Sequence, residues 1–448
     1  MERKRIYLCL AHMSDAGVEQ KYIKEAFDTN WVVPLGPNVN GFEKDLEDFV
    51  NGPSPALPKG KGVGSRVVAL SSGTAAVHLS LLACGVGPGD EVIVQSFTFC
   101  ASSHPITYLG AKPVFVDSET DSWNMDPELL ELAIKDRIAK TGKKPKAIVP
   151  VALYGMPYHI DEIMAIADKY GIPVIEDAAE GFGSRWEGRV LGTFGKFGVL
   201  SFNGNKMITT SGGGALICQT VDDKDKVMWY STQAREAYPY YHHEAIGYNY
   251  RMSNVCAGIG RGQMTVVDDH IAHHKKLKNL YKELLADVPG IKVHDNPDER
   301  YDSNFWLVTL TINPSLKIKG QENAYKTAVK GAIGGAAGVV HATDSAHTDC
   351  EPHDNVEALR MVLDAADVEA RPLWKPMHCQ PVYRGPVDKL IVDELTSGVI
   401  RQTSDASVAY VNGVSEALFK VGMCVPSGPC VSEEEVRYIV QCIKDAII

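Results

Sequence analysis

The sequence is short of the features that mark membrane and nucleic-acid-binding proteins. It has no apolar run of about twenty residues, the length that crosses a bilayer. Its N-terminus is basic, but the apolar stretch at residues 6–10 is too short for a signal peptide core. Lysine and arginine number 45 against 56 aspartates and glutamates, which gives a net charge of −11. Because phosphate backbones require clustered positive charge, we expect neither a nucleic acid nor a membrane as partner.

Cysteine pairs with the spacing of metal or redox motifs are also missing. The chain has ten cysteines, yet no two form a C-x-x-C pair and no set suits an iron–sulfur cluster. Several lie in apolar strings, as Cys84, Cys218 and Cys424 do, where buried reduced thiols are common. This usage predicts a reduced, cytoplasmic protein.

Short apolar strands and helices alternate through the first part of the chain. Strands are expected at residues 67–70, 90–95, 113–117, 147–153 and 173–176, with helices between them. This order predicts an α/β fold with a mostly parallel central sheet, whose ligand lies outside the carboxyl ends of the strands.

A long amphipathic helix at residues 268–287 is expected to lead into a second, smaller α+β domain. We therefore predict a large domain at 1–265, whose N-terminal segment can contact the small domain, and a small domain at 266–448. Residues 315–355, rich in Gly and Ala and then in His and Asp, interrupt the pattern as an insertion. Later helices are expected at 356–366, 408–419 and 433–447.

Lys206 lies in an unusual setting for a lysine, between an apolar approach and a glycine-rich run. A solvated side chain is the usual role of a lysine, but these neighbours favour one that forms an imine with pyridoxal 5′-phosphate (PLP). Asp177 ends a strand and is followed by two alanines that leave room for a ring. Its carboxylate would keep the pyridine nitrogen of the cofactor protonated, although a helix N-cap is the alternative.

Four further residues suit the same cofactor. Gly73 and Thr74 lie at a strand-to-helix turn, where free N–H groups bind phosphate, although Thr74 could instead be a plain N-cap. Ser201 offers a hydroxyl to the phosphate. Phe99 follows a strand and could stack on the ring, or lie in the core.

These pieces occur within an ordered set of motifs. The set comprises GP (36–37), FE (42–43), LSSGTAA (70–76), GPGDEV (87–92), SFTF (96–99), EDAAE (176–180), SFNGNK (201–206), GYNYRM (247–252) and RPLWKPMH (371–378). In this order the chain resembles the DegT/DnrJ/EryC1/StrS family of PLP-dependent nucleotide-sugar aminotransferases.

The resemblance implies a fold type I, aspartate aminotransferase-like homodimer with shared active sites. By motif position, Lys206 would be the imine lysine and Asp177 the partner of the pyridine nitrogen, with Phe99 on the ring. Glu180 would lie near the ring hydroxyl. The resemblance places Gly73, Thr74 and Ser201 at the phosphate, together with Asn249 from the other subunit, while Arg251 and His378 would reach the substrate across the interface.

The activity implied is transfer of an amino group from L-glutamate to a nucleotide-linked keto sugar in polysaccharide biosynthesis. The Asn-Gly-Asn-Lys form resembles enzymes that aminate C4 of UDP-linked 4-keto-6-deoxy-N-acetylhexosamines. The alternatives are a PLP-dependent sugar dehydratase or deoxygenase, which the lysine disfavours, and a non-catalytic PLP-fold regulatory protein.

The insertion departs from the family pattern. It contains His341, Asp344, His347, Cys350 and His353, whose spacing matches no zinc motif. We expect a polar surface insertion and no metal.

Overall fold

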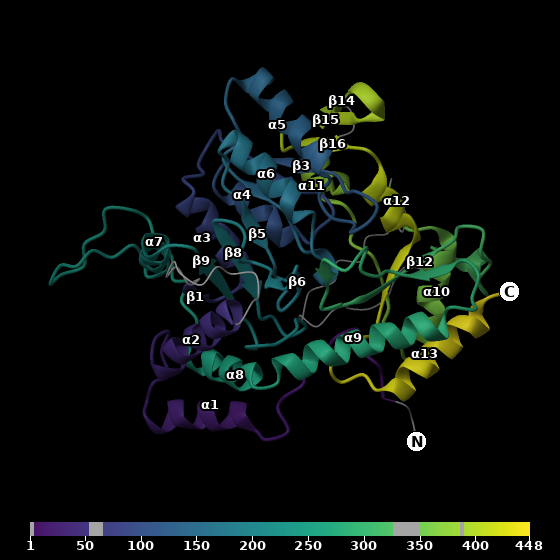
Figure 1. Ribbon diagram of the computed structural model, residues 1–448, viewed down its shortest axis with the longest axis horizontal. Coiled ribbons are helices and arrows are strands. Elements are labelled where there is room, and N and C mark those ends of the chain that lie inside the picture. Colours follow the sequence, from purple (N-terminus) through teal and green to yellow (C-terminus); the bar gives the residue numbers. More distant parts are fainter. Residues whose placement is uncertain (1–3, 53–65, 326–349, 386–388) are drawn as a thin grey trace.

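A large open sheet forms the centre of the computed structural model, which describes residues 4–52, 66–325, 350–385 and 389–448 (Figure 1). Its strands lie in the order β14-β15-β16-β3-β2-β4, followed by β5-β8-β9-β1. Parallel bridges from Ile148 to Val174 and from Val151 to Asp177 join the two halves between β4 and β5. From β16 to β8 all pairings are parallel, whereas β9 runs antiparallel to both β8 and β1. This confirms the expected α/β class with a mostly parallel sheet.

The strands are short, and all but the edge strands β14 and β15 are almost wholly buried. Their bounds are β1 Arg66–Leu70, β2 Glu91–Gln95, β3 Lys112–Val116, β4 Ile148–Val149, β5 Ile175–Asp177, β8 Phe197–Ser201 and β9 Gly214–Cys218, with β14 Ile391–Glu394, β15 Ile400–Thr403 and β16 Val408–Val411 at the far edge. Successive residues of β1 point to opposite faces, because Val67 and Ala69 join one apolar cluster while Val68 and Leu70 join another. Helices therefore cover both faces of the sheet.

The helices of the large unit precede, separate and follow its strands along the chain. They are α1 Val18–Asp28, α2 Pro37–Asn51, α3 Gly73–Ala83, α4 His104–Tyr108, α5 Pro127–Thr141, α6 Ile160–Tyr170, α7 Val221–Ser231 and α8 Asn254–Met264. The side chain of Asp126 caps α5 and Pro127 opens it, as the sequence predicts. A small sheet of β6 Arg185–Trp186, β7 Arg189–Val190 and β11 Tyr301–Asp302 lies beside them.

The long helix α9 (Val267–Leu284) runs from this unit to a second, antiparallel sheet, with α13 (Glu433–Ala446) packed beside it (Figure 1). The second sheet has the order β10-β12-β17-β13. Its strands are β10 Ile291–Val293, β12 Val308–Ile312, β17 Gly422–Val425 and β13 Arg371–Pro372, and α10 (Asp354–Ala365) packs with α13. A separate apolar cluster fills this α+β unit.

One expected helix is wrong. Residues 408–419 were predicted as a single helix, but Val408–Val411 form β16, which pairs in parallel with β3. Helix α12 (Val414–Val421) begins only after Gly413, whose φ of +87° breaks the chain direction. The strands β14 to β16 therefore extend the large sheet, although the sequence placed residues 266–448 in the small domain.

Within the described ranges, no helix is both long enough and apolar enough to span a bilayer.

Candidate active site

The loop after β8 holds Lys206 in a fixed turn. The Phe202 amide donates to the Gly213 carbonyl, and the Lys206 amide donates to the Asn203 carbonyl, both at 2.9 Å. The indole Nε1 of Trp306 donates to the carbonyl of Asn205 at 2.6 Å. Because the backbone on both sides is tied down, the Lys206 side chain has little freedom, and only 13% of it is exposed.

The amine of Lys206 lies in a polar and aromatic corner. Its Nζ is 3.3 Å from Oε1 of Glu180 and 3.9 Å from the centroid of the Trp306 ring. Burial raises the pKa of Glu180, and the charge of Lys206 opposes that rise. The Glu180 carboxylate therefore stands within reach of the Lys206 amine as an acceptor for its proton, and the Trp306 ring lies against the same amine.

Asp177, the last residue of β5, is a buried carboxylate with few partners. Its Oδ2 accepts a hydrogen bond from Ser102 Oγ at 2.6 Å, and its Oδ1 accepts one from the Ala179 amide at 3.1 Å. Burial raises the pKa of Asp177. No helix follows it, so the N-cap alternative is wrong. Among the described residues no cationic side chain forms an ion pair with Asp177, and such a carboxylate suits a protonated ring nitrogen.

The turn between the end of β1 and the start of α3 offers free backbone N–H groups of the kind that bind anions. Ser72 is the N-cap, since its Oγ accepts from the Ala75 amide at 3.0 Å, so Thr74 does not fill that role. Gly73 and Thr74 are the first residues of α3, where backbone N–H groups have no partner within the helix. A Cβ on Gly73 would lie 3.0 Å from the Cβ of Ser201, which shows how closely β8 approaches this turn. The structure therefore brings the three predicted phosphate residues together.

Phe99 is 55% exposed, so the core alternative for this residue is wrong. Its ring lies 6.3 Å from that of Trp374, centroid to centroid, in an edge-to-face arrangement. The Trp374 amide donates to the hydroxyl of Tyr154 at 2.8 Å. An open aromatic face therefore stands at the carboxyl end of β2, available to a flat ligand.

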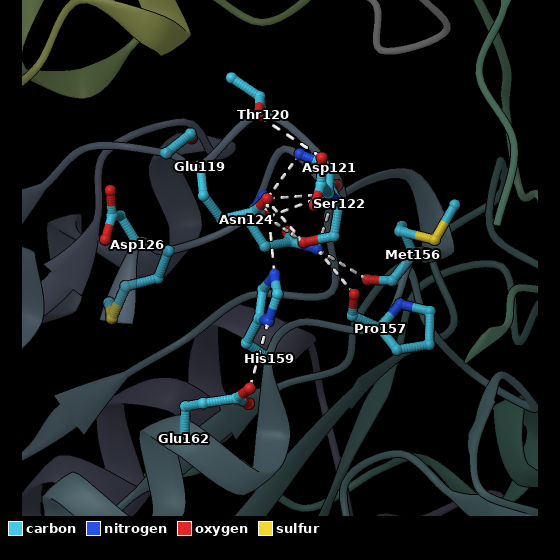
Figure 2. Close-up of polar contacts among 12 residues, drawn as sticks. Glu119, Thr120, Asp121, Ser122, Asn124, Asp126, Met156, Pro157, His159 and Glu162 are labelled. Atoms are coloured by element: carbon cyan, nitrogen blue, oxygen red, sulfur yellow. Dashed lines mark hydrogen bonds and ion pairs between the residues drawn. The ribbon is translucent and has the colours of Figure 1, made fainter. Parts of the chain in front are cut away.

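A polar cluster behind the site fixes the loop that holds Glu180. The Tyr154 amide donates to Glu180 Oε2 at 2.8 Å. Asn124 supports that loop, because its side chain accepts from the Leu153 amide at 3.1 Å and donates to the Met156 carbonyl at 3.0 Å, the latter visible in Figure 2. The Glu180 carboxylate is thus held through both oxygens: Oε2 accepts from the Tyr154 amide, and Oε1 contacts the Lys206 amine.

The remaining predicted residues lie in different environments. Asn249 is exposed, which is compatible with a role toward a second chain. The side chain of Arg251 is only 8% exposed: its Nη1 donates to Glu43 Oε1 at 2.6 Å and to the Ala69 carbonyl at 2.9 Å. These contacts give Arg251 a structural role, and we leave it out of the substrate site. His378 is 2% exposed, with Nδ1 2.6 Å from Ser96 Oγ and Nε2 3.2 Å from Glu416 Oε1, so within the single chain both of its ring nitrogens have partners.

Ser102, Trp306 and Tyr154 were missed by the sequence reasoning. Each acts on Asp177, Lys206 or Glu180 from a distant segment. Only Ser102 carried a signal, since it lies just after the Ser-Phe-Thr-Phe motif at the end of β2.

A lysine amine, a buried carboxylate, an open aromatic ring and a helix N-terminus thus meet at the carboxyl ends of one sheet. This arrangement defines the PLP-dependent enzymes of fold type I. The model of the DegT/DnrJ/EryC1/StrS aminotransferase family matches residues 14–349.

Similar proteins span nearly the whole chain. EpsN of Bacillus subtilis (strain 168) is 39% identical, covering 98% of this chain and 95% of its own, and GDP-perosamine synthase of Escherichia coli O157:H7 is 30% identical, covering 98% of each. The crystal structure of a DegT DnrJ EryC1 StrS aminotransferase from Brucella abortus matches with a TM-score of 0.75 at 25% identity, over 96% of this chain and 95% of that one. The chain therefore belongs to the DegT/DnrJ/EryC1/StrS family, and it is a PLP-dependent aminotransferase.

Proposed function

We propose that the protein transfers the amino group of L-glutamate to C4 of a UDP-linked 4-keto-6-deoxy-N-acetylhexosamine. The observation that carries the proposal is the contact of the Lys206 amine with Glu180, 3.3 Å away, on the edge of the sheet where Asp177 ends β5. An amine that must both attach to a cofactor and carry protons needs such an acceptor close by.

Each part of the cofactor has a residue suited to it. Gly73, Thr74 and Ser201 would hold the phosphate, Asp177 the ring nitrogen, and Phe99 the ring face. When bound, PLP supplies an electron sink that makes the proton on the amine-bearing carbon acidic. Asp177 keeps that sink effective because its buried carboxylate favours a protonated ring nitrogen.

Lys206 would carry the proton in both half-reactions. Once its amine is free, Lys206 Nζ would remove the proton from Cα of glutamate in the first half-reaction and would deliver a proton to C4 of the sugar in the second. Glu180, held by the Tyr154 amide, fixes the amine near the reacting atoms. Trp306 covers Lys206 and limits the access of water to it.

The nucleotide of the sugar substrate has two candidates, UDP and GDP. The Asn-Gly-Asn-Lys segment at residues 203–206 supports the UDP-linked sugar by resemblance. The similarity to GDP-perosamine synthase over nearly the whole chain favours a GDP-linked keto sugar as the second candidate. An assay of UDP- and GDP-linked keto sugars with L-glutamate decides between them. Turnover of neither, with glutamate consumed to 2-oxoglutarate, would contradict the choice of sugar.

The cofactor role of Lys206 has its own test. Visible spectra of the purified protein with added PLP should show a bound-cofactor band that L-glutamate bleaches. Lys206→Ala should lose the band and all measurable turnover, whereas Lys276→Ala, which removes an exposed lysine paired with Glu433, should keep both. Turnover by Lys206→Ala would exclude the role given to Lys206. A band without bleaching would instead favour the dehydratase or the regulatory alternative.

A further inference from the structure

Two thiols and a carboxylate converge at a place that the aminotransferase chemistry does not use. The Sγ atoms of Cys350 and Cys379 and a carboxylate oxygen of Glu416 all lie within 4.8 Å of one another. Both thiols are buried, each 4% exposed. Cys350 lies near the C-terminal end of the insertion, Cys379 ends the short helix η4 (Met377–Cys379), and Glu416 lies in the first turn of α12. Three separate segments therefore supply one donor each.

This donor set is chemically suited to zinc. Zn²⁺ prefers thiolate, imidazole and carboxylate ligands in a tetrahedron, with Zn–S near 2.3 Å and Zn–O near 2.1 Å, so the donor atoms on one ion lie about 3.3–3.8 Å apart. The observed spacing needs only small side-chain rotations to reach these values. Two neighbouring thiols alone would also suit a disulfide, but a disulfide does not involve a carboxylate. The presence of Glu416 at the same point therefore favours a metal.

The charges around the three donors suit a cation with thiolate ligands. Cys350 Sγ lies 4.0 Å from Oε2 of Glu416, Nζ of Lys420 lies 3.9 Å from the same oxygen, and the charge of Lys375 also acts on both thiols. A metal would displace the proton of each thiol, because the thiolate is the form that binds it. A Zn²⁺ ion with two thiolates and one carboxylate carries a net charge of −1, which the two lysines offset.

The third donor is held in place by a histidine. His378 Nε2 lies 3.2 Å from Glu416 Oε1, and its Nδ1 lies 2.6 Å from Ser96 Oγ. The contact with His378 lowers the pKa of Glu416 to about 2, so its carboxylate is ionised. A histidine bonded to a metal-binding carboxylate is a common outer-shell arrangement that orients the ligand.

We propose that Cys350, Cys379 and Glu416 bind one Zn²⁺ ion, with the fourth position taken by water. The ion would clamp the C-terminal end of the insertion to α12 and to the loop that carries Trp374 beside Phe99. This proposal replaces the expectation of no metal. Its partners could not be found by spacing, since Cys379 and Glu416 lie far along the chain from Cys350. Of the other insertion candidates, His341, Asp344 and His347 lie outside the described residues, and His353 is an exposed N-cap.

Cobalt offers a readout that is independent of activity. The holoenzyme is treated with EDTA and titrated with Co²⁺, and the tetrahedral thiolate bands are followed in the red part of the spectrum, where PLP does not absorb. We expect saturation at about one Co²⁺ per chain and displacement by Zn²⁺. Cys379→Ser and Cys350→Ser should each remove the bands, while Cys442→Ser, a half-buried thiol on α13, should keep them.

A variant outside the first coordination sphere adds a graded test. His378→Gln should weaken Zn²⁺ binding about 10- to 100-fold without removing the bands. Circular dichroism and the bound-PLP spectrum report whether each variant is folded. The proposal would be overturned if the EDTA-treated wild type showed no bands after Co²⁺ was added, or if the bands survived in folded Cys379→Ser. A Cys350–Cys379 disulfide in freshly purified protein would also overturn it.

Discussion

Asp177 illustrates how much a buried charge depends on single neighbours. Its carboxylate is compensated within the described chain by one hydroxyl, Ser102 Oγ, and one amide. Hydrogen bonds to charged groups contribute about 1.5–3 kcal/mol each. In the role proposed for Asp177, its basicity toward the ring nitrogen would be set in part by Ser102, which contacts the carboxylate and not the cofactor.

Removing that hydroxyl should weaken the reaction without destroying the site. We expect Ser102→Ala to lower kcat about tenfold, in line with the loss of one charge-assisted hydrogen bond, and Asp177→Asn to lower it far more. The matched control is Ser103→Ala, since the neighbouring serine bonds Tyr383 and Cys100 and does not contact Asp177. Steady-state rates with glutamate and a keto sugar measure both. Equal losses in the two serine variants would contradict the role of Ser102.

Gly73 gives a second test at the residue scale. A Cβ there would lie 3.0 Å from Ser201 Cβ and 3.3 Å from its Oγ, so a methyl group would crowd the hydroxyl that is proposed to bind phosphate. We expect Gly73→Ala to raise the Kd for PLP more than about tenfold. Gly87→Ala is the control, because a Cβ on Gly87 would meet no atom within 4 Å. Fluorescence titration of the apoenzyme measures both values, and equal Kd values would exclude the proposed phosphate site.

Some site residues are marked by a local sequence pattern, and others are defined only by contacts with distant parts of the chain. Lys206, Asp177 and Gly73 stand at strand ends or turns with a recognisable local pattern, so the sequence alone is enough to predict a role for them. Trp306 lies 101 residues beyond Asn205, to which it is bonded, and nothing near Trp306 marks it. Arg251 lies in a recognisable motif, yet its buried pairing with Glu43 depends on tertiary packing that the motif does not encode.

At the scale of elements, the prediction was wrong for a segment whose apolar pattern is compatible with both a helix and a strand. Residues 408–419 have apolar positions compatible with a helix, but the first four form a strand because β3 offers an open edge for parallel pairing. No local pattern announces that edge, since it exists only after the sheet has formed. The capped helices α5 and α13 were found because their start signals are local.

The contact between Glu119 and His159 links the loop after β3 to the start of α6 (Figure 2). Its atoms are 3.5 Å apart, with side-chain exposures of 14% and 20%. Hydrogen bonding to Glu119 raises the pKa of His159, and the pKa of Glu119 is lowered against the effect of its burial. The stabilisation from His159 is therefore complete below its unfolded pKa, near 6.5, and is lost as the pH rises through its folded pKa.

His159→Gln should consequently destabilise the protein at mildly acidic pH and little at alkaline pH. We expect a loss of about 1 kcal/mol or less near pH 5.5, shrinking toward zero near pH 8.5, because the pair is partly exposed. Thermal melts at both pH values measure it, with the exposed His353→Gln as control. A Tm difference that is the same at both pH values would show that His159 acts through packing and not through charge.

At the scale of the whole molecule, the segment between α7 and α8 exposes apolar side chains that nothing else in the single chain covers within the described residues. It extends away from the body of the chain (Figure 1) and exposes Tyr238, Tyr240, Tyr241 and Ile246. Exposed aromatic clusters of this kind mark protein interfaces. Asn249 lies at the end of the same segment and is exposed. We therefore retain the homodimer, with Asn249 at the partner's phosphate, as a proposal.

Complementation between two inactive variants tests this sharing. Lys206→Ala removes the amine, and Asn249→Asp places a negative charge where the phosphate of the partner would lie, so each variant alone should be inactive. In a mixed dimer, the chain that carries the Asn249→Asp substitution keeps Lys206 and receives an intact Asn249 from the other chain, which restores one complete site. We expect co-expressed, tandem-tagged mixed dimers to regain about half of the wild-type rate per dimer, because one of two sites is intact. If Asn249 served its own chain, neither site would be complete and the mixed dimer would stay inactive.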